Sequence, residues 1–403
     1  MKMIFNFILA CTGPDPIVTV VAEDGVDLPL AGLSEDDIAT FFDGDRLFDF
    51  TFAEGDGLGP VYIRSSCGSC HAEGGRGPGT VQKMVVVESD GVTPAADQSV
   101  LAWGHTVRPY VGGSGPAQAI VAPTEGWPDG NALLVTVRYP PPVLARGYLE
   151  AIEDAEIERV EAEQADRTDG ISGRINRVTY RSQANEDDAF HGYTFGETDL
   201  IGRFGLKARQ PTLDDFAGDA LQGDMGITSP LRPDELPNPA GLPDDDHVGL
   251  DADLKLVNDL ADYMRLIAIP QRAPEDANGR ELFEAVGCGV CHVPALRTRA
   301  DYPIAQLADL DAPVFTDLLL HDLGVAMGDG MTDESATPTE WKTAPLVGLR
   351  FMGNLLHDGR AVTVEDAILD HAGDGSEANG VIDAFDDLSL ADRASLIAFV
   401  ESL

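Results

Sequence analysis

Two short stretches of this chain share the pattern Cys-x-x-Cys-His, at residues 67–71 and again at residues 288–292. Two thiols at this spacing can add to the two vinyl groups of a porphyrin, and the histidine that follows can ligate its iron. The two copies use four of the five cysteines in the chain. The repeat therefore predicts two covalently attached c-type haems, with Cys67, Cys70, Cys288 and Cys291 as attachment points and His71 and His292 as iron ligands.

Other uses of paired cysteines explain this repeat less well. A zinc site would gather all four thiolates, yet the pairs are far apart in the sequence and the histidines would have no role. A thioredoxin-like dithiol requires one motif beside a strand–helix–strand pattern. Disulfide bonds within each pair would leave the repeated histidine unexplained.

The first residues have the parts of an export signal. Lys2 precedes a short apolar run within residues 1–10, and the small Ala10 stands directly before Cys11. Residues 8–11 resemble a bacterial lipobox, which implies a signal peptide over 1–10, a lipidated Cys11 and a flexible tether over 11–32. The alternative is a shortened ordinary signal with a leftover cysteine.

The expected location is therefore the periplasm or cell envelope. No other apolar run approaches the ~20 residues that span a bilayer, so membrane contact is expected only through the lipid anchor.

Acidic residues dominate the charge of the chain, with 69 Asp and Glu against 27 Lys and Arg and a net charge of −42. Such a surface repels nucleic acid and anionic lipid, which excludes both as partners. Two interpretations remain, namely solubility in a saline habitat and steering of a basic electron-donor protein. The acidic residues are spread through the chain, which favours solubility.

A chain of 403 residues is longer than one hydrophobic core usually supports. We expect a mainly α fold of two cytochrome-c-like haem domains, over residues 33–145 and 271–403. Between them, residues 146–270 form a mixed helix and loop segment that completes the first domain or bridges the two. A small amount of β-structure is expected, with one strand over 135–139.

Each haem motif follows a helix in this interpretation. Apolar residues at helical spacing predict a helix over 33–50, which Ser34 can cap, and a shorter helix that opens near Asn278. The repeated helix and motif indicate a duplicated unit. A further helix is predicted over 250–269 and a closing helix over 389–403.

A histidine lies on an apolar helix face near the C-terminus. Residues 364, 367, 368 and 371 fall at helical spacing, and Thr363 with Asp366 makes a capping-box-like start. A histidine facing a core is commonly a hydrogen-bonded structural residue. The second haem iron, however, requires a group on its far side, and His371 belongs to the same predicted domain.

The order of several further motifs resembles the dihaem oxidoreductase family, whose members are labelled peroxidases or thiol oxidoreductases. The resemblance runs from about residue 40 to the C-terminus and extends more distantly to bacterial dihaem cytochrome c peroxidases. Besides the two haem motifs, it rests on Gly57-Leu58-Gly59-Pro60, Gly75-Arg76-Gly77, Asp169-Gly170-Ile171-Ser172-Gly173-Arg174, Gly202-Arg203-Phe204-Gly205, Lys207-Ala208, Thr316-Asp317-Leu318-Leu319-Leu320-His321-Asp322, Glu340-Trp341-Lys342-Thr343-Ala344-Pro345-Leu346 and Leu356-His357-Asp358-Gly359-Arg360-Ala361.

The resemblance implies roles for the histidines. His71 and His292 correspond to proximal ligands, and His371 takes the place of the far ligand of the electron-transfer haem, where the peroxidases usually have methionine. A bis-His haem has a lower potential than a Met/His haem, which argues against a simple transfer of the peroxidase mechanism. The alternatives for this ligand are Met327, Met331 and Met352.

A peroxidatic haem also requires a general acid–base residue. The resemblance to the peroxidases implies Glu125 as this residue, and the alternative is an ordinary surface carboxylate. His105 is a candidate sixth ligand or distal hydrogen-bond donor, with Met84 and Met225 as other candidate ligands of the first haem. Three tryptophans are candidates for carrying electrons between the haems, and they are Trp103, Trp127 and Trp341.

Residues 166–170 place two carboxylates around a glycine turn. Such a turn can hold calcium through oxygen ligands, although the full loop spacing of a calcium site is missing. A capped turn without an ion is the alternative.

Together these observations predict an exported dihaem c-type oxidoreductase that resembles a peroxidase. Electrons from a donor such as a small cytochrome would enter at the haem of His292 and His371. They would then reach the haem of His71, where hydrogen peroxide or another small oxidant is reduced. The alternative is a non-catalytic dihaem electron carrier in which both irons are six-coordinate.

Overall fold

The computed structural model describes residues 27–72, 75–77, 79–112, 118–236, 247 and 249–403, together with the backbone of residues 19–20. The signal peptide predicted over 1–10, Cys11 and most of the tether lie outside these ranges. Within them, no helix is both long and apolar enough to cross a membrane.

The fold is mixed, whereas the sequence led us to expect a mainly α protein. Helices alternate with short paired strands and long connecting segments. The connecting segments are long because many glycines and prolines interrupt regular secondary structure.

The helix before the first haem motif packs against a helix from the middle of the chain. Helix α1 (Glu35–Phe48) begins at Ser34, whose Oγ accepts the Asp37 amide at 3.1 Å, and it crosses α5 (Leu254–Leu266). Gly44 allows the close approach, since a Cβ there would lie 2.7 Å from the Asp259 carbonyl oxygen. Tyr263 of α5 packs between two phenylalanines of α1, at ring-centroid distances of 5.3 Å and 5.1 Å.

The helix before the second motif has a similar partner. Helix α6 (Ala277–Val286) crosses α9 (Leu390–Glu401) at Gly279, where a Cβ would lie 2.7 Å from the Cβ of Phe399. Phe283 follows Gly279 by one helical turn and packs edge-to-face on Phe399 at 5.3 Å. In both units, therefore, a glycine and a phenylalanine one turn later form the crossing, which supports a duplicated helix-and-motif unit.

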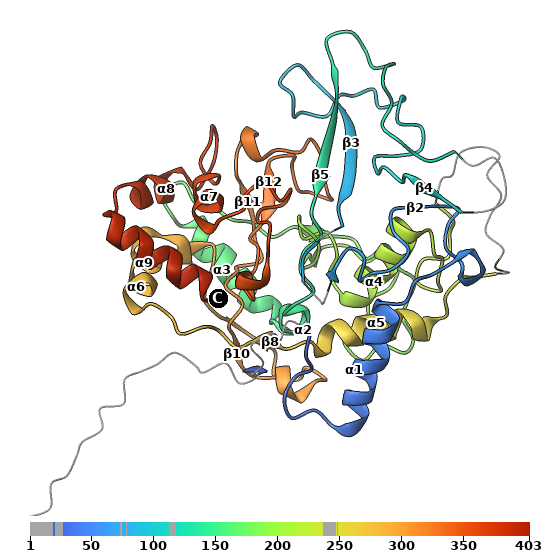
Figure 1. Ribbon diagram of the computed structural model, residues 1–403, viewed down its shortest axis with the longest axis horizontal. Helices are drawn as coiled ribbons and strands as arrows, with labels where there is room; N and C mark the ends of the chain where they lie inside the picture. Colours follow the sequence, from blue (N-terminus) through green and yellow to red (C-terminus); the bar gives the residue numbers. More distant parts are fainter. Residues whose placement is uncertain are drawn as a thin grey trace, which may run out of the picture.

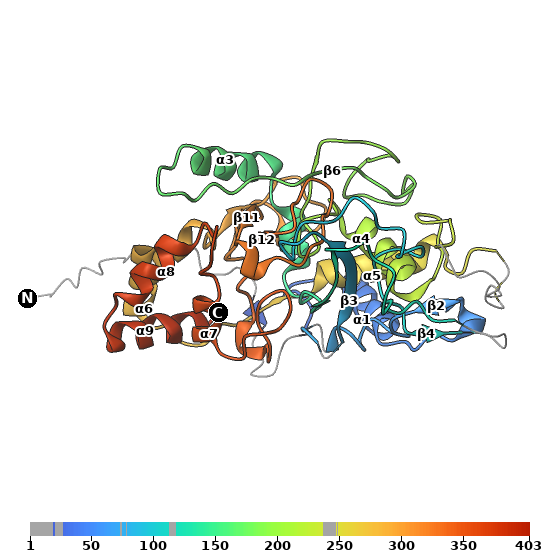
Figure 2. The same ribbon diagram turned by 90° about the horizontal axis from the view of Figure 1, so that it is seen from above.

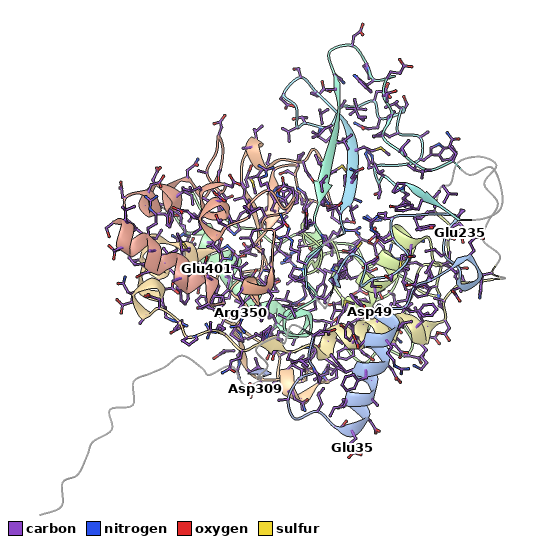
Figure 3. All side chains as sticks on the ribbon, in the orientation of Figure 1. Glu35, Asp49, Glu235, Asp309, Arg350 and Glu401 are labelled. Atoms are coloured by element: carbon purple, nitrogen blue, oxygen red, sulfur yellow. The ribbon has the colours of Figure 1, made fainter. Side chains whose placement is uncertain are left out.

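The two helix pairs occupy opposite ends of the molecule. Figures 1 and 2 both place α6, α9, α7 (Val364–Leu369) and α8 (Asn379–Asp386) at one end. The crossing of α1 with α5 lies at the other end, next to α4 (Leu213–Ala220). Figure 3 shows Glu35 at the outer tip of α1 and Asp49 at its inner end, where the chain turns towards the first motif.

Hydrophobic packing connects the middle segment to both flanking regions. One core cluster contains residues from Leu30 to Val347, including the buried faces of α1, α2 (Arg146–Ala151), α4 and α5. Helix α3 (Asp154–Ala165) adds Ile157 and Val160 to the same cluster. A second cluster is confined to residues between Phe283 and Leu403.

A two-stranded antiparallel ribbon projects from the body in Figure 1. It pairs β3 (Val81–Val87) with β5 (Ala132–Arg138). The strand predicted over 135–139 corresponds to β5 to within a few residues, whereas β3 was not predicted. The ribbon belongs to a third small core around Met84.

The remaining elements are short. The strands are β1 (Thr19–Val20), β2 (Val61–Tyr62), β4 (Tyr110–Val111), β6 (Arg177–Val178), β7 (Leu200–Ile201), β8 (Ile269–Pro270), β9 (Leu296–Arg297), β10 (Asp311–Ala312), β11 (Leu320–Asp322) and β12 (Glu340–Lys342), paired as β1–β8, β2–β4, β6–β7, β9–β10 and β11–β12. The short helical turns are Glu54–Asp56, Leu221–Met225, Cys288–Val290, Ala305–Leu307, Val325–Met327 and Leu349–Phe351.

Candidate haem-binding site

Each Cys-x-x-Cys-His motif forms one compact turn. The His292 amide donates to the Cys288 carbonyl at 3.0 Å, and the His71 amide donates to the Cys67 carbonyl at 2.9 Å. The second motif begins directly after α6, which ends at Gly287 with a left-handed φ of 104°. Each turn thus carries two thiols and an imidazole close together on a short, fixed piece of backbone.

The four thiols are free. Cys67 and Cys288 pack against hydrophobic clusters, whereas Cys291 Sγ lies 3.7 Å from His321 Nδ1. Burial raises the pKa of Cys67 to about 12 and that of Cys288 to about 12. A zinc site or a reactive dithiol requires an environment that stabilises thiolate, and the surroundings of these thiols do the opposite. Free, protonated thiols in an apolar pocket fit thioether attachment to a porphyrin better than these alternatives.

A cavity adjoins the second motif. Cys288, Cys291 and His292 line it, and its volume is about 240 Å³. Most of the wall is apolar, and helices α6, α7 and α9 contribute Phe283, Val364, Ile368, Leu396 and Val400 to it.

His292 is oriented by a backbone carbonyl. Its Nδ1 lies 3.2 Å from the Phe315 carbonyl oxygen. Burial, followed by the nearby charge of His371, lowers the pKa of His292 to about 4. The imidazole is therefore neutral, donates through Nδ1 and keeps the Nε2 lone pair for a metal.

His371 lines the same cavity and is held in a similar way. Its Nδ1 lies 2.6 Å from the Ala367 carbonyl oxygen, and burial lowers its pKa. We expected His371 on a helix face, but α7 ends at Leu369 and His371 belongs to the turn that follows. The cap of α7 is Asp370, and the chain then continues through residues 370–375 to Gly375, which has a φ of 85°.

His71 lies close to the wall of this cavity. Burial, followed by the charge of Arg146, lowers the pKa of His71 to about 4, and the nearby Pro141 carbonyl acts in the opposite direction. Pro141 and Arg146 both line the cavity of the second motif. Among the described residues, the buried His71 Nδ1 has no partner with hydrogen-bond geometry.

The structure does not bring Glu125 or His105 into polar contact with His71. Glu125 is exposed, on the segment that leads into β5, and forms no hydrogen bond or ion pair with another described residue. His105 is half-buried, and its Nδ1 lies 2.9 Å from the Met84 carbonyl oxygen beside β3.

The Asp169 carboxylate in the turn at residues 166–170 has protein partners. The Arg167 guanidinium pairs with it, and the Ile171 amide donates to Asp169 Oδ1 at 3.4 Å. These contacts fit the capped turn, and calcium at this turn stays a prediction.

The sequence did not predict that several of the cavity residues would meet. Trp341, a candidate electron carrier, stacks on His357 with ring centroids 3.7 Å apart, and the Lys207 ammonium lies 4.0 Å from the centre of the indole. The cations that line the cavity include Arg76, Arg146 and Lys342. No local pattern predicts their meeting, because they come from segments far apart in the chain.

Three solved structures share a distant resemblance with the chain. Hydrazine synthase of Kuenenia stuttgartiensis under xenon is 15% identical with a TM-score of 0.35, and the match covers 100% of both chains. A variant of the dihaem peroxidase BthA from Burkholderia thailandensis is 17% identical with a TM-score of 0.37, covering 94% of this chain and 87% of that one. A MauG-like protein associated with microbial copper homeostasis is 12% identical with a TM-score of 0.33, covering 70% of this chain and 95% of that one.

These scores carry no argument about function, and a comparison with curated proteins finds no match. The evidence for a family comes from the family model described as "Di-haem oxidoreductase, putative peroxidase", which matches residues 20–101 and 130–403. This match covers most of the chain and includes both haem motifs. The chain therefore belongs to the di-haem oxidoreductase family.

Proposed function

We propose that this protein is an exported c-type dihaem oxidoreductase of the peroxidase kind. The observation that carries the proposal is the cavity at the second motif. Cys288, Cys291 and His292 line this cavity together with His371. Both imidazoles point their Nδ1 atoms at backbone carbonyls, which leaves both Nε2 atoms available. Free thiols, neutral imidazoles and an apolar cavity wall fit a haem.

Cys288 and Cys291 would hold this haem covalently, with His292 and His371 as its axial ligands. Bound haem supplies one-electron chemistry, while the protein sets its ligation, its exposure and its potential. Two imidazoles favour a lower potential than one imidazole and one thioether. This site is suited to receive electrons from a strongly reducing donor, such as a small cytochrome.

The first motif would hold the second haem of the proposed protein. Cys67 and Cys70 would attach the other haem, and the neutral His71 would ligate it. Glu125 is the proposed group that moves a proton between the oxygens of a peroxide, as the family resemblance implies. Its exposed carboxylate would need to reach the site when substrate binds.

Export and anchoring are part of the proposal. Residues 1–10 would direct export, and lipidation of Cys11 would keep the protein at the periplasmic or cell-envelope membrane. Calcium is not part of the proposal, because Arg167 already neutralises the Asp169 carboxylate.

Covalent attachment can be tested by mass spectrometry of the full chain made in a host that matures c-type cytochromes. The double variant Cys288→Ala with Cys291→Ala should carry one haem, and so should Cys67→Ala with Cys70→Ala. A variant that still carries two haems would overturn the assignment of that motif.

A second function is favoured by the position of His105. Its Nδ1 is tied to a backbone carbonyl in the same way as in His292 and His371, so its Nε2 is also free. If His105 closes the first site, the protein is an electron carrier without substrate chemistry. A high-spin component that shifts with cyanide supports the enzyme, and two low-spin six-coordinate haems support the carrier.

Glu125→Gln provides the direct test of the proton-transfer role. Peroxide turnover should fall by about 10²–10⁴-fold while both haems remain bound, because a general acid–base residue contributes that much. Asp129→Asn, an exposed carboxylate on the same segment, is the matched control and should leave turnover intact. Unchanged turnover in the Glu125 variant would remove this residue from the mechanism.

A further inference from the structure

Two buried cations on the cavity wall have no carboxylate partner. Arg146 is 2% exposed and Lys342 is 8% exposed. Neither side chain forms an ion pair within 4.0 Å in the part of the chain that the structure describes. The Arg146 Nε donates to the Pro142 carbonyl at 2.7 Å, and the Lys342 ammonium has only a long contact of 3.5 Å to the Thr343 carbonyl.

Several other buried cations of this protein have acidic partners, although Arg108 instead donates to the Gly223 carbonyl. Arg265 pairs with Glu150 at 2.6 Å, and Arg138 pairs with Asp329 at 2.6 Å. The chain has 69 acidic residues for its 27 basic ones, so acidic partners are abundant. Burying a charge costs folding free energy unless the charge is paired. Two unpaired cations in the wall of one cavity therefore indicate that an anion binds beside them.

The two cations also act on each other. Burial first, and then the charge of Arg146, lowers the pKa of Lys342 to about 7. Asp317 is the carboxylate that acts on Lys342, but it already pairs with His321 at 2.8 Å. Like charges that repel each other in a buried wall are destabilising until an anion lies nearby.

We propose that Arg146 and Lys342 form an anion site that binds a carboxylate side chain of the haem held at the second motif. The two cations line the same cavity as Cys288, Cys291 and His292. A guanidinium binds a carboxylate through two parallel hydrogen bonds, and an ammonium adds a point charge. The inference rests on the proposed function, since it assigns residues to the haem that the proposed function places there.

A carboxylate in this position could come from the haem or from a free organic acid. The two sources share the same chemistry, and resonance Raman spectra separate them. The bending band of the haem propionate groups reports hydrogen bonds to those groups and is insensitive to an acid bound elsewhere.

The test uses full-length holoprotein with Lys342→Met, Lys342→Arg and Arg146→Gln, and mass spectrometry first checks that both haems are attached. Lys342→Met should shift the propionate band and lower one midpoint potential, because a cation beside a haem favours its reduced form. Lys342→Arg should keep the propionate band and the midpoint potential of the wild type. Arg146→Gln should shift the band and the potential in the same direction as Lys342→Met.

Lys255→Met is the matched control, since it removes one positive charge from an exposed pair with Asp259. It should leave the band and the potential unchanged. An unchanged band and potential in Lys342→Met, with both haems attached, would overturn the inference. A saturable response of the wild type to acetate, abolished by Lys342→Met while the propionate band stays fixed, would reassign the site to a free acid and overturn the haem assignment. Absence of a haem at Cys288 and Cys291 in the wild type would instead refute the proposed function itself.

Discussion

At the residue scale, hydrogen bonds to backbone carbonyls decide what each histidine can do. His292, His371 and His105 all place Nδ1 near a carbonyl oxygen, at 3.2, 2.6 and 2.9 Å. A neutral imidazole that donates through Nδ1 presents a lone pair at Nε2, which is the form that binds a metal. The sequence identified these three residues, but their orientation depends on carbonyls of segments whose positions the sequence does not reveal.

His371→Met tests the far ligand of the second haem. A thioether in place of an imidazole stabilises the reduced iron, so one midpoint potential should rise markedly while the other stays fixed. A spectroelectrochemical titration of the holoprotein measures both potentials. Met352→Leu is the control, because Met352 also lines the cavity. If the Met352 variant moved a potential and the His371 variant did not, Met352 would be the ligand.

At the element scale, two glycines set how closely the helix pairs approach. A Cβ at Gly44 or at Gly279 would overlap backbone or Cβ atoms of the facing helix, α5 or α9. Backbone atoms cannot move aside as a flexible side chain can, so the helices themselves would have to separate. The two crossings therefore depend on glycine at these positions.

Gly44→Ala and Gly279→Ala should each lower the free energy of unfolding by about 1–3 kcal/mol, the usual cost of overpacking a core. Gly380→Ala in α8 is the matched control, because nothing lies within 4 Å of a Cβ at that position. It should stabilise the protein by up to about 1 kcal/mol through helix propensity. Denaturant unfolding monitored by circular dichroism measures all three, and a neutral Gly44→Ala would contradict the close crossing.

The elements that the sequence predicted are those with a strong local pattern. The apolar spacing and the Ser34 cap located α1, and the apolar spacing located α9, each to within about two residues. The strand β3 was missed, although residues 85–87 are three consecutive valines, because a short apolar run fits a strand or a buried helix equally well. The pairing of α1 with α5 could not be predicted, since a long-range contact has no signature in either segment.

At the scale of the whole molecule, the residues proposed to attach the haems stand out in the sequence, and the cavity beside the second motif does not. Two local motifs named the thiols and proximal histidines. The wall that completes the second site combines α6, α7 and α9 with Arg146 from α2 and Lys342 from β12. Only the folded chain brings these segments together. The sequence alone therefore does not predict that Arg146 and Lys342 are buried in the wall of one cavity.

The net charge of −42 also acts on the whole molecule. With 69 acidic and 27 basic residues, most carboxylates have no cation to pair with, so the folded state concentrates negative charge that the unfolded chain spreads out. Added salt screens this repulsion, and the Debye length falls from about 10 Å at 0.1 M to about 3 Å at 1 M. We therefore expect the free energy of unfolding to rise with sodium chloride over this range.

Urea unfolding of the holoprotein at several salt concentrations measures this effect, and the dependence on salt should shrink as the pH approaches the isoelectric point near 4.2. Surface ion pairs such as Arg159 with Glu163 act in the opposite direction, because salt weakens them. A free energy of unfolding that fell with added salt at neutral pH would mean that these pairs outweigh the repulsion. The acidic surface would then stabilise the fold through local pairing, and the surplus of carboxylates would have to be explained by something other than solubility in salt.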